Sequence, residues 1–194
     1  MKRTTPDRFQ FFVAPGVYLI LSILILLVPL RWLVGAAVSA VVHELFHIAA
    51  IRCFRIPIYS VRIGMCGAQI RTPPMLVIQE LICALAGPLG GLLLLAFARW
   101  FPVTALCAGF HSLYNLLPVY PQDGGRALRC GAKMLLPEKW ANLLCQLVEY
   151  ATLSGVGILG FYGTFILKAG ILPLVFSILF LRRSLGMKNS LQRG

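Results

Sequence analysis

Acidic residues are scarce in this chain, and so are charged residues of any kind. Of the 194 residues only 6 are Asp or Glu, and charged residues make up 12% while hydrophobic residues make up 59%. About a quarter of the residues in a soluble domain are normally charged. With a mean hydropathy of +0.84, the composition excludes an ordinary soluble domain and predicts an integral membrane protein.

Paired cysteine motifs and a concentrated basic surface are also missing. The 6 cysteines include no C-x-x-C pair, and most fall in apolar runs or on the predicted cytoplasmic side, where thiols stay reduced. We therefore expect small apolar packing residues and no disulfide framework. The net charge of +12 is spread over four short flanks, which is typical of anchoring to anionic lipid and not of a nucleic-acid-binding surface.

Long apolar runs predict an all-α membrane protein, a single domain over residues 1–194 built as a bundle of about six transmembrane helices. Each full-length run can cross about 30 Å of hydrocarbon as a helix. The predicted spans are 11–30, 33–51, 75–98, 102–117 and 143–167, with a shorter one at 171–181.

The basic residues predict the orientation of these spans, because Lys and Arg favour the cytoplasmic side of a membrane. If the N-terminus is cytoplasmic, only Arg31, Arg99 and Lys168 of the 18 basic residues fall outside. The clusters at both ends, 2–8 and 182–193, then lie inside. The predicted topology therefore has both termini in the cytoplasm.

The second span contains the motif H-E-L-F-H, with His43, Glu44 and His47 in an apolar segment. On a helix, residues four apart share a face, so both imidazoles can bind one zinc ion. Glu44 would act as general base toward a water whose pKa the ion lowers toward about 7. An ionisable residue within a membrane span is costly, which favours a functional role over a structural one.

Asp123 is the predicted third ligand. It lies in the segment N-L-L-P-V-Y-P-Q-D-G-G at 115–125, where two prolines would stiffen an extended turn and two glycines would permit unusual dihedral angles. At the start of this segment, Asn115 could donate a hydrogen bond to a substrate carbonyl or oxyanion. Glu80 and Glu149 are alternative ligands, and His111 is either a packed histidine or a partner of the metal ligands.

The segment between the second and third spans alternates apolar and polar residues and turns near Gly64 to Gly67. This pattern predicts a short membrane-associated β-hairpin, which could hold an extended substrate by β-augmentation or could be a plain surface hairpin. In the third span Gly87 and Gly91 form G-x-x-x-G, which predicts close helix packing.

Two of these motifs, H-E-L-F-H at 43–47 and N-L-L-P-V-Y-P-Q-D-G-G at 115–125, resemble those of the site-2 protease family of intramembrane zinc metalloproteases. A third, L-A-G-P-L-G-G at 85–91, is similar to the family's A-G-P motif. The resemblance implies a helical membrane bundle in which His43, His47 and Asp123 bind Zn²⁺ and Glu44 is the catalytic base. It also implies membrane-spanning or membrane-tethered protein substrates, such as a transcription factor or sigma factor precursor.

The sequence departs from the family at three places. Phe46 replaces a common glycine, Gln122 replaces an apolar residue, and Gly90–Gly91 stand where an asparagine is often found, which leaves substrate preference open. Because no PDZ or CBS domain is evident, the chain resembles a compact bacterial type, similar to the sporulation-factor branch, in the cell membrane, and any regulator would be another membrane protein. The alternative function is a non-enzymatic metal carrier or permease using the histidines with Glu80 and Glu149.

Overall fold

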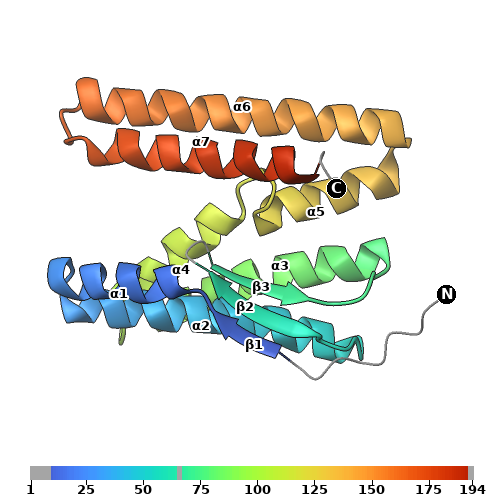
Figure 1. Ribbon diagram of the computed structural model, residues 1–194, viewed down its shortest axis with the longest axis horizontal. Helices are drawn as coiled ribbons and strands as arrows, with labels where there is room; N and C mark the ends of the chain where they lie inside the picture. Colours follow the sequence, from blue (N-terminus) through green and yellow to red (C-terminus); the bar gives the residue numbers. More distant parts are fainter. Residues whose placement is uncertain (1–9, 65–66, 192–194) are drawn as a thin grey trace. The chain divides into compact units, whose positions relative to one another are not determined.

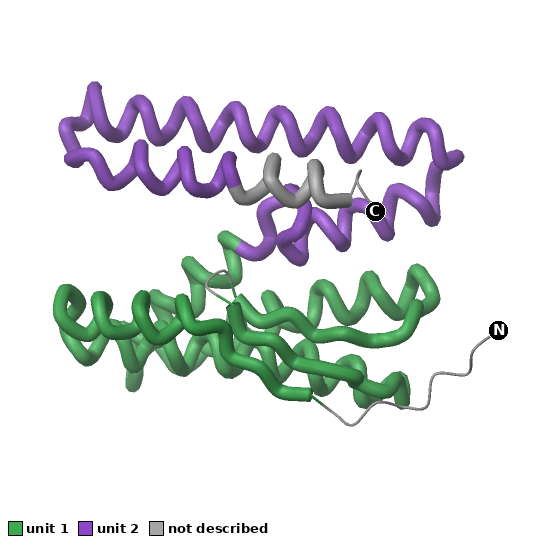
Figure 2. Tube along the Cα trace, in the orientation of Figure 1, with its two compact units in different colours: residues 1–114 green, residues 115–194 purple. Residues whose placement is uncertain are grey.

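The structure is a computed structural model that describes residues 10–64 and 67–191 (Figure 1). The chain forms two compact units, Met1–Tyr114 and Asn115–Gly194 (Figure 2). Several residues on which the predicted topology and hairpin turn depend lie outside the described residues: Lys2, Arg3, Arg8, Met65, Cys66 and Arg193.

The helices of the first unit are α1 (Pro15–Leu27), α2 (Leu30–Cys53), α3 (Val77–Leu93), which continues as a 3-10 turn, η1 (Leu94–Phe97), and α4 (Pro102–Asn115). Helices α1 and α4 begin at a proline, and α2 begins directly after Pro29. Proline suits a helix start because its fixed φ is helical and its missing N–H would have no intrahelical partner there. Helix α2 packs on α3, and this pair positions the candidate site.

The first unit also contains a small sheet of three strands in the order β1 (Gln10–Val13), β2 (Ser60–Gly64), β3 (Gly67–Arg71). The predicted hairpin is confirmed, since β2 and β3 pair antiparallel with Arg62 opposite Gln69. The predicted helical membrane fold is confirmed in its main part, since most described residues are helical. The prediction missed β1, which adds a parallel strand to β2 at residues predicted to start the first span. The guanidinium carbon of Arg62 lies 5.0 Å above the ring of its register partner Phe12, a cation–π contact across the sheet.

The second unit consists of three helices, α5 (Asp123–Leu135), α6 (Glu138–Phe165) and α7 (Leu172–Leu191). Helices α6 and α7 lie side by side and antiparallel (Figure 1). Gly160 of α6 leaves space for Ser177 of α7. The hydroxyl of Ser177 lies within hydrogen-bond distance of two backbone carbonyls, 3.0 Å from that of Val156 and 2.9 Å from that of Pro173. A small-residue contact of this kind is typical of helices packed within a membrane.

Among the residues that the structure describes, three helical segments are long and apolar enough to cross a membrane: α2, the run of α3 with η1 (Val77–Phe97), and α6. Helix α1 and the segment Leu172–Arg182 are apolar but shorter. Helix α4 has 14 residues, about 21 Å, which is less than the hydrocarbon thickness of about 30 Å. Large apolar side chains lie on the outside, up to 84% exposed at Leu26. These features describe a membrane protein, and the count of six spans stays a prediction.

Candidate metal centre

One face of α2 is buried along its whole length. Its buried residues recur every four positions, so they form one stripe along the helix. They are Gly35, Ser39, His43, His47 and Ile51. His43 is 3% exposed and His47 is 8% exposed, so the histidine pair lies inside the protein and not on the surface that faces lipid.

The two imidazoles converge through their Nε2 atoms. These atoms lie 3.1 Å apart, and the rings meet edge to face with centroids 4.7 Å apart and planes inclined by 82°. Two nitrogen ligands of a tetrahedral zinc ion, each bound at about 2.0–2.1 Å, are separated by about 3.3 Å. The spacing of the two nitrogens therefore fits one shared zinc ion.

Helix α3 sets the orientation of His47. Its Nδ1 lies 2.7 Å from the backbone carbonyl oxygen of Cys83, and a carbonyl only accepts, so Nδ1 carries the proton and donates it. The neutral ring then has its lone pair on Nε2, the atom that faces His43, which is the arrangement found in metal-binding histidines. Gly87, one turn after Cys83, has no side chain where the His47 ring lies. The A-G-P motif thus provides the space for His47, and Cys83, just before the motif, provides the acceptor.

Two further glycines of α3 receive side chains from neighbouring helices. A Cβ at residue 90 would overlap the ring of Phe46, and a Cβ at residue 91 would overlap the hydroxyl of Ser112 on α4. The large Phe46 and the minimal Gly90 therefore form one complementary contact. Both positions depart from the family pattern, and the structure shows that the two departures fit each other. Gly87 and Gly91 do mediate close helix packing, as predicted from the sequence.

His111 of α4 lies against His43. Their rings are stacked, with centroids 4.7 Å apart and planes inclined by 16°, and the Nδ1 of His111 lies 3.3 Å from the hydroxyl of Ser39. Ser39 is absent from the predicted site, although its position one turn before His43 was the signal that could have identified it. The structure therefore places a third imidazole beside the predicted ligand pair.

Glu44 follows His43 on α2 and is half-buried. Asn115 is the last residue of α4, and Glu80 lies in the first turn of α3; both are half-buried. Glu149 is buried near the middle of α6. The predicted base is thus the sequence neighbour of the predicted ligand His43 on α2. The alternative ligands, Glu80 and Glu149, lie on two other helices.

Asp123 is buried and is the first residue of α5. The prediction of an extended turn at this residue is wrong, because the helix already begins here; a carboxylate is favourable at a helix N-terminus. The guanidinium of Arg126, three residues later, lies 3.9 Å from one carboxylate oxygen of Asp123. Side chains at Gly124 and Gly125 would overlap the backbone of Leu116 and Val119 respectively. The two glycines therefore let α5 start directly against the loop that precedes it.

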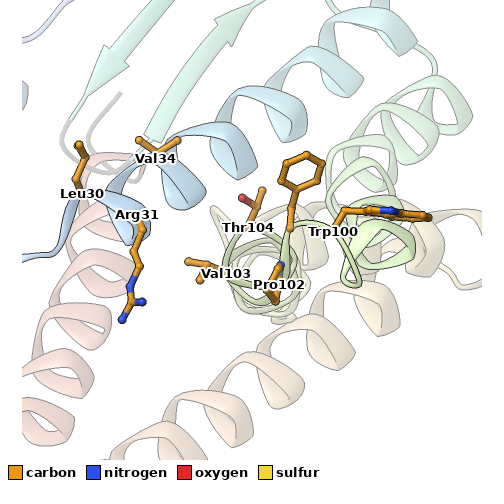
Figure 3. Close-up of a pocket in the computed structure, with 8 residues that line it drawn as sticks. Leu30, Arg31, Val34, Trp100, Pro102, Val103 and Thr104 are labelled. Carbon is orange, nitrogen blue, oxygen red and sulfur yellow. The ribbon is translucent and has the colours of Figure 1, made fainter.

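A shallow apolar groove of about 500 Å³ lies at the beginning of α2 and α4 (Figure 3). Arg31 and Thr104 are among its lining residues. Arg31 precedes His43 by 12 residues on α2, about 18 Å along the helix axis. The groove is therefore separate from the histidine pair and contributes nothing to it.

Comparison with known proteins places this geometry in a known fold. The chain is similar to the solved structure of the site-2 protease from Methanocaldococcus jannaschii, with a TM-score of 0.58 and 21% sequence identity, covering 84% of this chain and 81% of that one. No family model and no curated protein matches the sequence. The resemblance indicated by the sequence motifs is confirmed at the level of the fold, which is that of a site-2 protease.

Proposed function

We propose that this chain is an intramembrane zinc metalloprotease of the site-2 protease family, which hydrolyses peptide bonds of membrane-spanning or membrane-tethered proteins. The observation that carries the proposal is the pair of Nε2 atoms 3.1 Å apart on one buried helix face, with His47 oriented by a backbone carbonyl. The fold similarity supports the same conclusion independently.

The zinc ligands in this proposal are His43, His47 and Asp123. Each of these side chains is buried and offers one ligand atom of a kind that zinc binds. Two imidazoles and one carboxylate match the three-ligand sets of catalytic zinc sites, which keep a fourth position for water or substrate. When bound, zinc supplies Lewis acidity that polarises the attacking water and the scissile carbonyl.

Glu44 is the general base in this mechanism. Its carboxylate accepts a proton from the attacking water and delivers it to the leaving amine nitrogen, so one residue serves both proton transfers. Asn115 donates a hydrogen bond to the carbonyl oxygen as negative charge develops on it. The outer edge of β3, the last strand of the sheet among the described residues, would hold the substrate backbone in the extended form that cleavage requires.

The proposed location is the bacterial cell membrane, with several spans and both termini in the cytoplasm. The partners are a transmembrane substrate protein, such as a tethered transcription factor or sigma factor precursor, the surrounding lipid, and a regulatory membrane protein. The apolar exterior and the three long apolar helices support the membrane location.

The test compares Glu44→Gln with wild type, using zinc content and cleavage of co-expressed single-span substrates. We expect the variant to retain zinc and to lose cleavage by a factor of about 10² or more, because the proton acceptor is gone while the ligands remain. Glu138→Gln is the matched control, since Glu138 is exposed at the start of α6, and it should cleave normally. Cleavage by Glu44→Gln at the wild-type rate would contradict the mechanism, and metal transport without cleavage would favour the alternative carrier function.

A further inference from the structure

His111 is a half-buried imidazole beside His43 that the proposed reaction does not use. It stacks on His43 and lies within hydrogen-bond distance of Ser39. We propose that His111 is a positioning residue that holds the His43 ring in its metal-binding orientation, and that Ser39 in turn orients His111. The inference rests on the proposed function in one respect, namely that His43 is a metal ligand.

The stacking contact restricts the rotation of the His43 ring, and this rotation decides whether its Nε2 faces the metal position. Turning the imidazole of His43 about its Cβ–Cγ bond moves Nε2 away from His47, and this terminal torsion is broad and weakly restrained by itself. His111 covers one face of the ring with nearly parallel planes, and His47 meets the same ring edge to face. Neighbours in both directions therefore restrict the ring to the plane in which Nε2 points at Nε2 of His47.

Ser39 connects His111 to the helix that carries His43. It lies one turn before His43 on the same buried stripe of α2 and is 1% exposed, so water does not compete for its hydroxyl. The 3.3 Å contact works in either tautomer of His111, because the hydroxyl can donate to a bare Nδ1 or accept from a protonated one. The contact with Ser39 therefore fixes the ring of His111 relative to α2.

The backbone of His111 is held by a separate contact. The next residue, Ser112, is fully buried, and its hydroxyl occupies the space beside Gly91 on α3. Helix α4 therefore touches α2 through His111 and α3 through Ser112. Because α4 contacts both helices, a residue on α4 can fix the orientation of the predicted ligand His43 on α2.

Outer contacts of this kind typically change metal affinity by about 10–100-fold when they are removed. We expect His111→Ala to weaken zinc binding within that range and to broaden the visible absorption spectrum of the Co²⁺-substituted protein. His111→Phe keeps a flat ring against His43, so its zinc affinity should stay within about 5-fold of wild type. Ser39→Ala should weaken zinc binding by about 3–10-fold, and it should have no further effect when combined with His111→Phe, which has no ring nitrogen to orient.

The experiment measures zinc dissociation constants by chelator competition in detergent for wild type, both single variants at residue 111, Ser39→Ala and the double variant. Thermal unfolding of the metal-free proteins measures any general loss of packing. His111→Ala can show such a loss, but the loss does not depend on zinc. Wild-type zinc affinity and an unchanged Co²⁺ spectrum in His111→Ala would overturn the inference. Equal losses in His111→Phe and His111→Ala would also overturn it, because they would make a ring nitrogen a direct ligand or catalytic group.

These outcomes are separable from those of the proposed protease activity. A wild-type protein that binds zinc but cuts no substrate would contradict the protease function and leave the role of His111 intact if the affinity series holds. A wild-type protein that binds no zinc would overturn both. Zinc-dependent cleavage together with equal zinc dissociation constants in the wild type and the variants at residues 39 and 111 would overturn only the role of His111.

Discussion

The imidazole of His47 occupies the space that a side chain at residue 87 would need. This contact joins α2 to α3 at the same place where His47 donates its Nδ1 proton to the carbonyl of Cys83. A glycine at residue 87 is therefore a condition for the orientation of His47, and the same contact brings α2 and α3 close together.

Gly87→Ala should disturb the metal centre directly. Its new methyl group must displace the His47 ring or separate the helices, and either movement breaks the hydrogen bond to Cys83. We expect about 1–3 kcal/mol of destabilisation from overpacking and a loss of zinc affinity of about tenfold or more. Gly155→Ala on α6 is the matched control, because nothing lies within 4 Å of its added Cβ; it should leave zinc binding unchanged. Equal zinc affinities in the two variants would contradict the role of Gly87.

Phe46 and Gly90 should be coupled in stability. Gly90→Ala alone places a methyl group into the Phe46 ring, and we expect it to cost about 1–3 kcal/mol despite the better helix propensity of alanine. In the Phe46→Ala background the same change should be neutral or stabilising, because the ring is absent. Thermal unfolding of the four proteins measures the coupling, expected at about 0.5–3 kcal/mol. Additive effects would show that the ring and the glycine do not share one space.

Gly124→Ala tests how the start of α5 is built. A Cβ there would overlap the carbonyl of Leu116, so the first turn of α5 must shift, and Asp123 shifts with it. We expect zinc affinity to fall by about tenfold or more. Gly131→Ala lies in the same helix with open space around its added Cβ, and its zinc affinity should equal that of wild type. If both variants bind zinc equally, the position of Asp123 does not depend on this glycine.

The adjacency of His43 and His47 could be predicted from spacing alone, because any helix places residues four apart on one face. The groups that orient His47 could not, since the carbonyl of Cys83 lies 36 residues away and meets it only through the packing of α2 on α3. The spacing of Gly87 and Gly91 indicated a close contact, but only the structure identifies His47 and Ser112 as the side chains that fill the space.

The missed strand has a comparable explanation. Residues 10–13 read Q-F-F-V and continue into the apolar run of α1, so no alternation separates a strand from a span. Their partners begin at Ser60 on β2, and parallel pairing over such a distance leaves no local signal. The hairpin was predictable because β2 and β3 are close in sequence, with glycine at the end of β2 and at the start of β3. At Asp123, prolines and glycines suggested a turn, whereas an acidic residue before an amphipathic segment also suits a helix start.

Zinc should stabilise the folded protein, and the size of the stabilisation identifies the ligands. A ligand that binds only the folded state raises the free energy of unfolding by about 2.7 kcal/mol at a concentration 100 times its dissociation constant. We therefore expect chelator treatment to lower the melting temperature of the wild-type protein in detergent and added zinc to restore it. His43→Ala should show no zinc-dependent shift, because too few ligands remain.

Asp123→Ala should keep a reduced shift, because two imidazoles still bind zinc weakly. This variant also loses a carboxylate at the N-terminus of α5, which by itself costs about 0.3–1 kcal/mol. That cost is present with and without zinc, so it cancels when each protein is compared with its own metal-free form. A full wild-type shift in Asp123→Ala would remove Asp123 from the ligand set, whereas a shift that is absent from the wild type would exclude the metal centre altogether. The difference between the two melting curves of one protein, and not the melting temperature itself, therefore decides whether the carboxylate binds the ion.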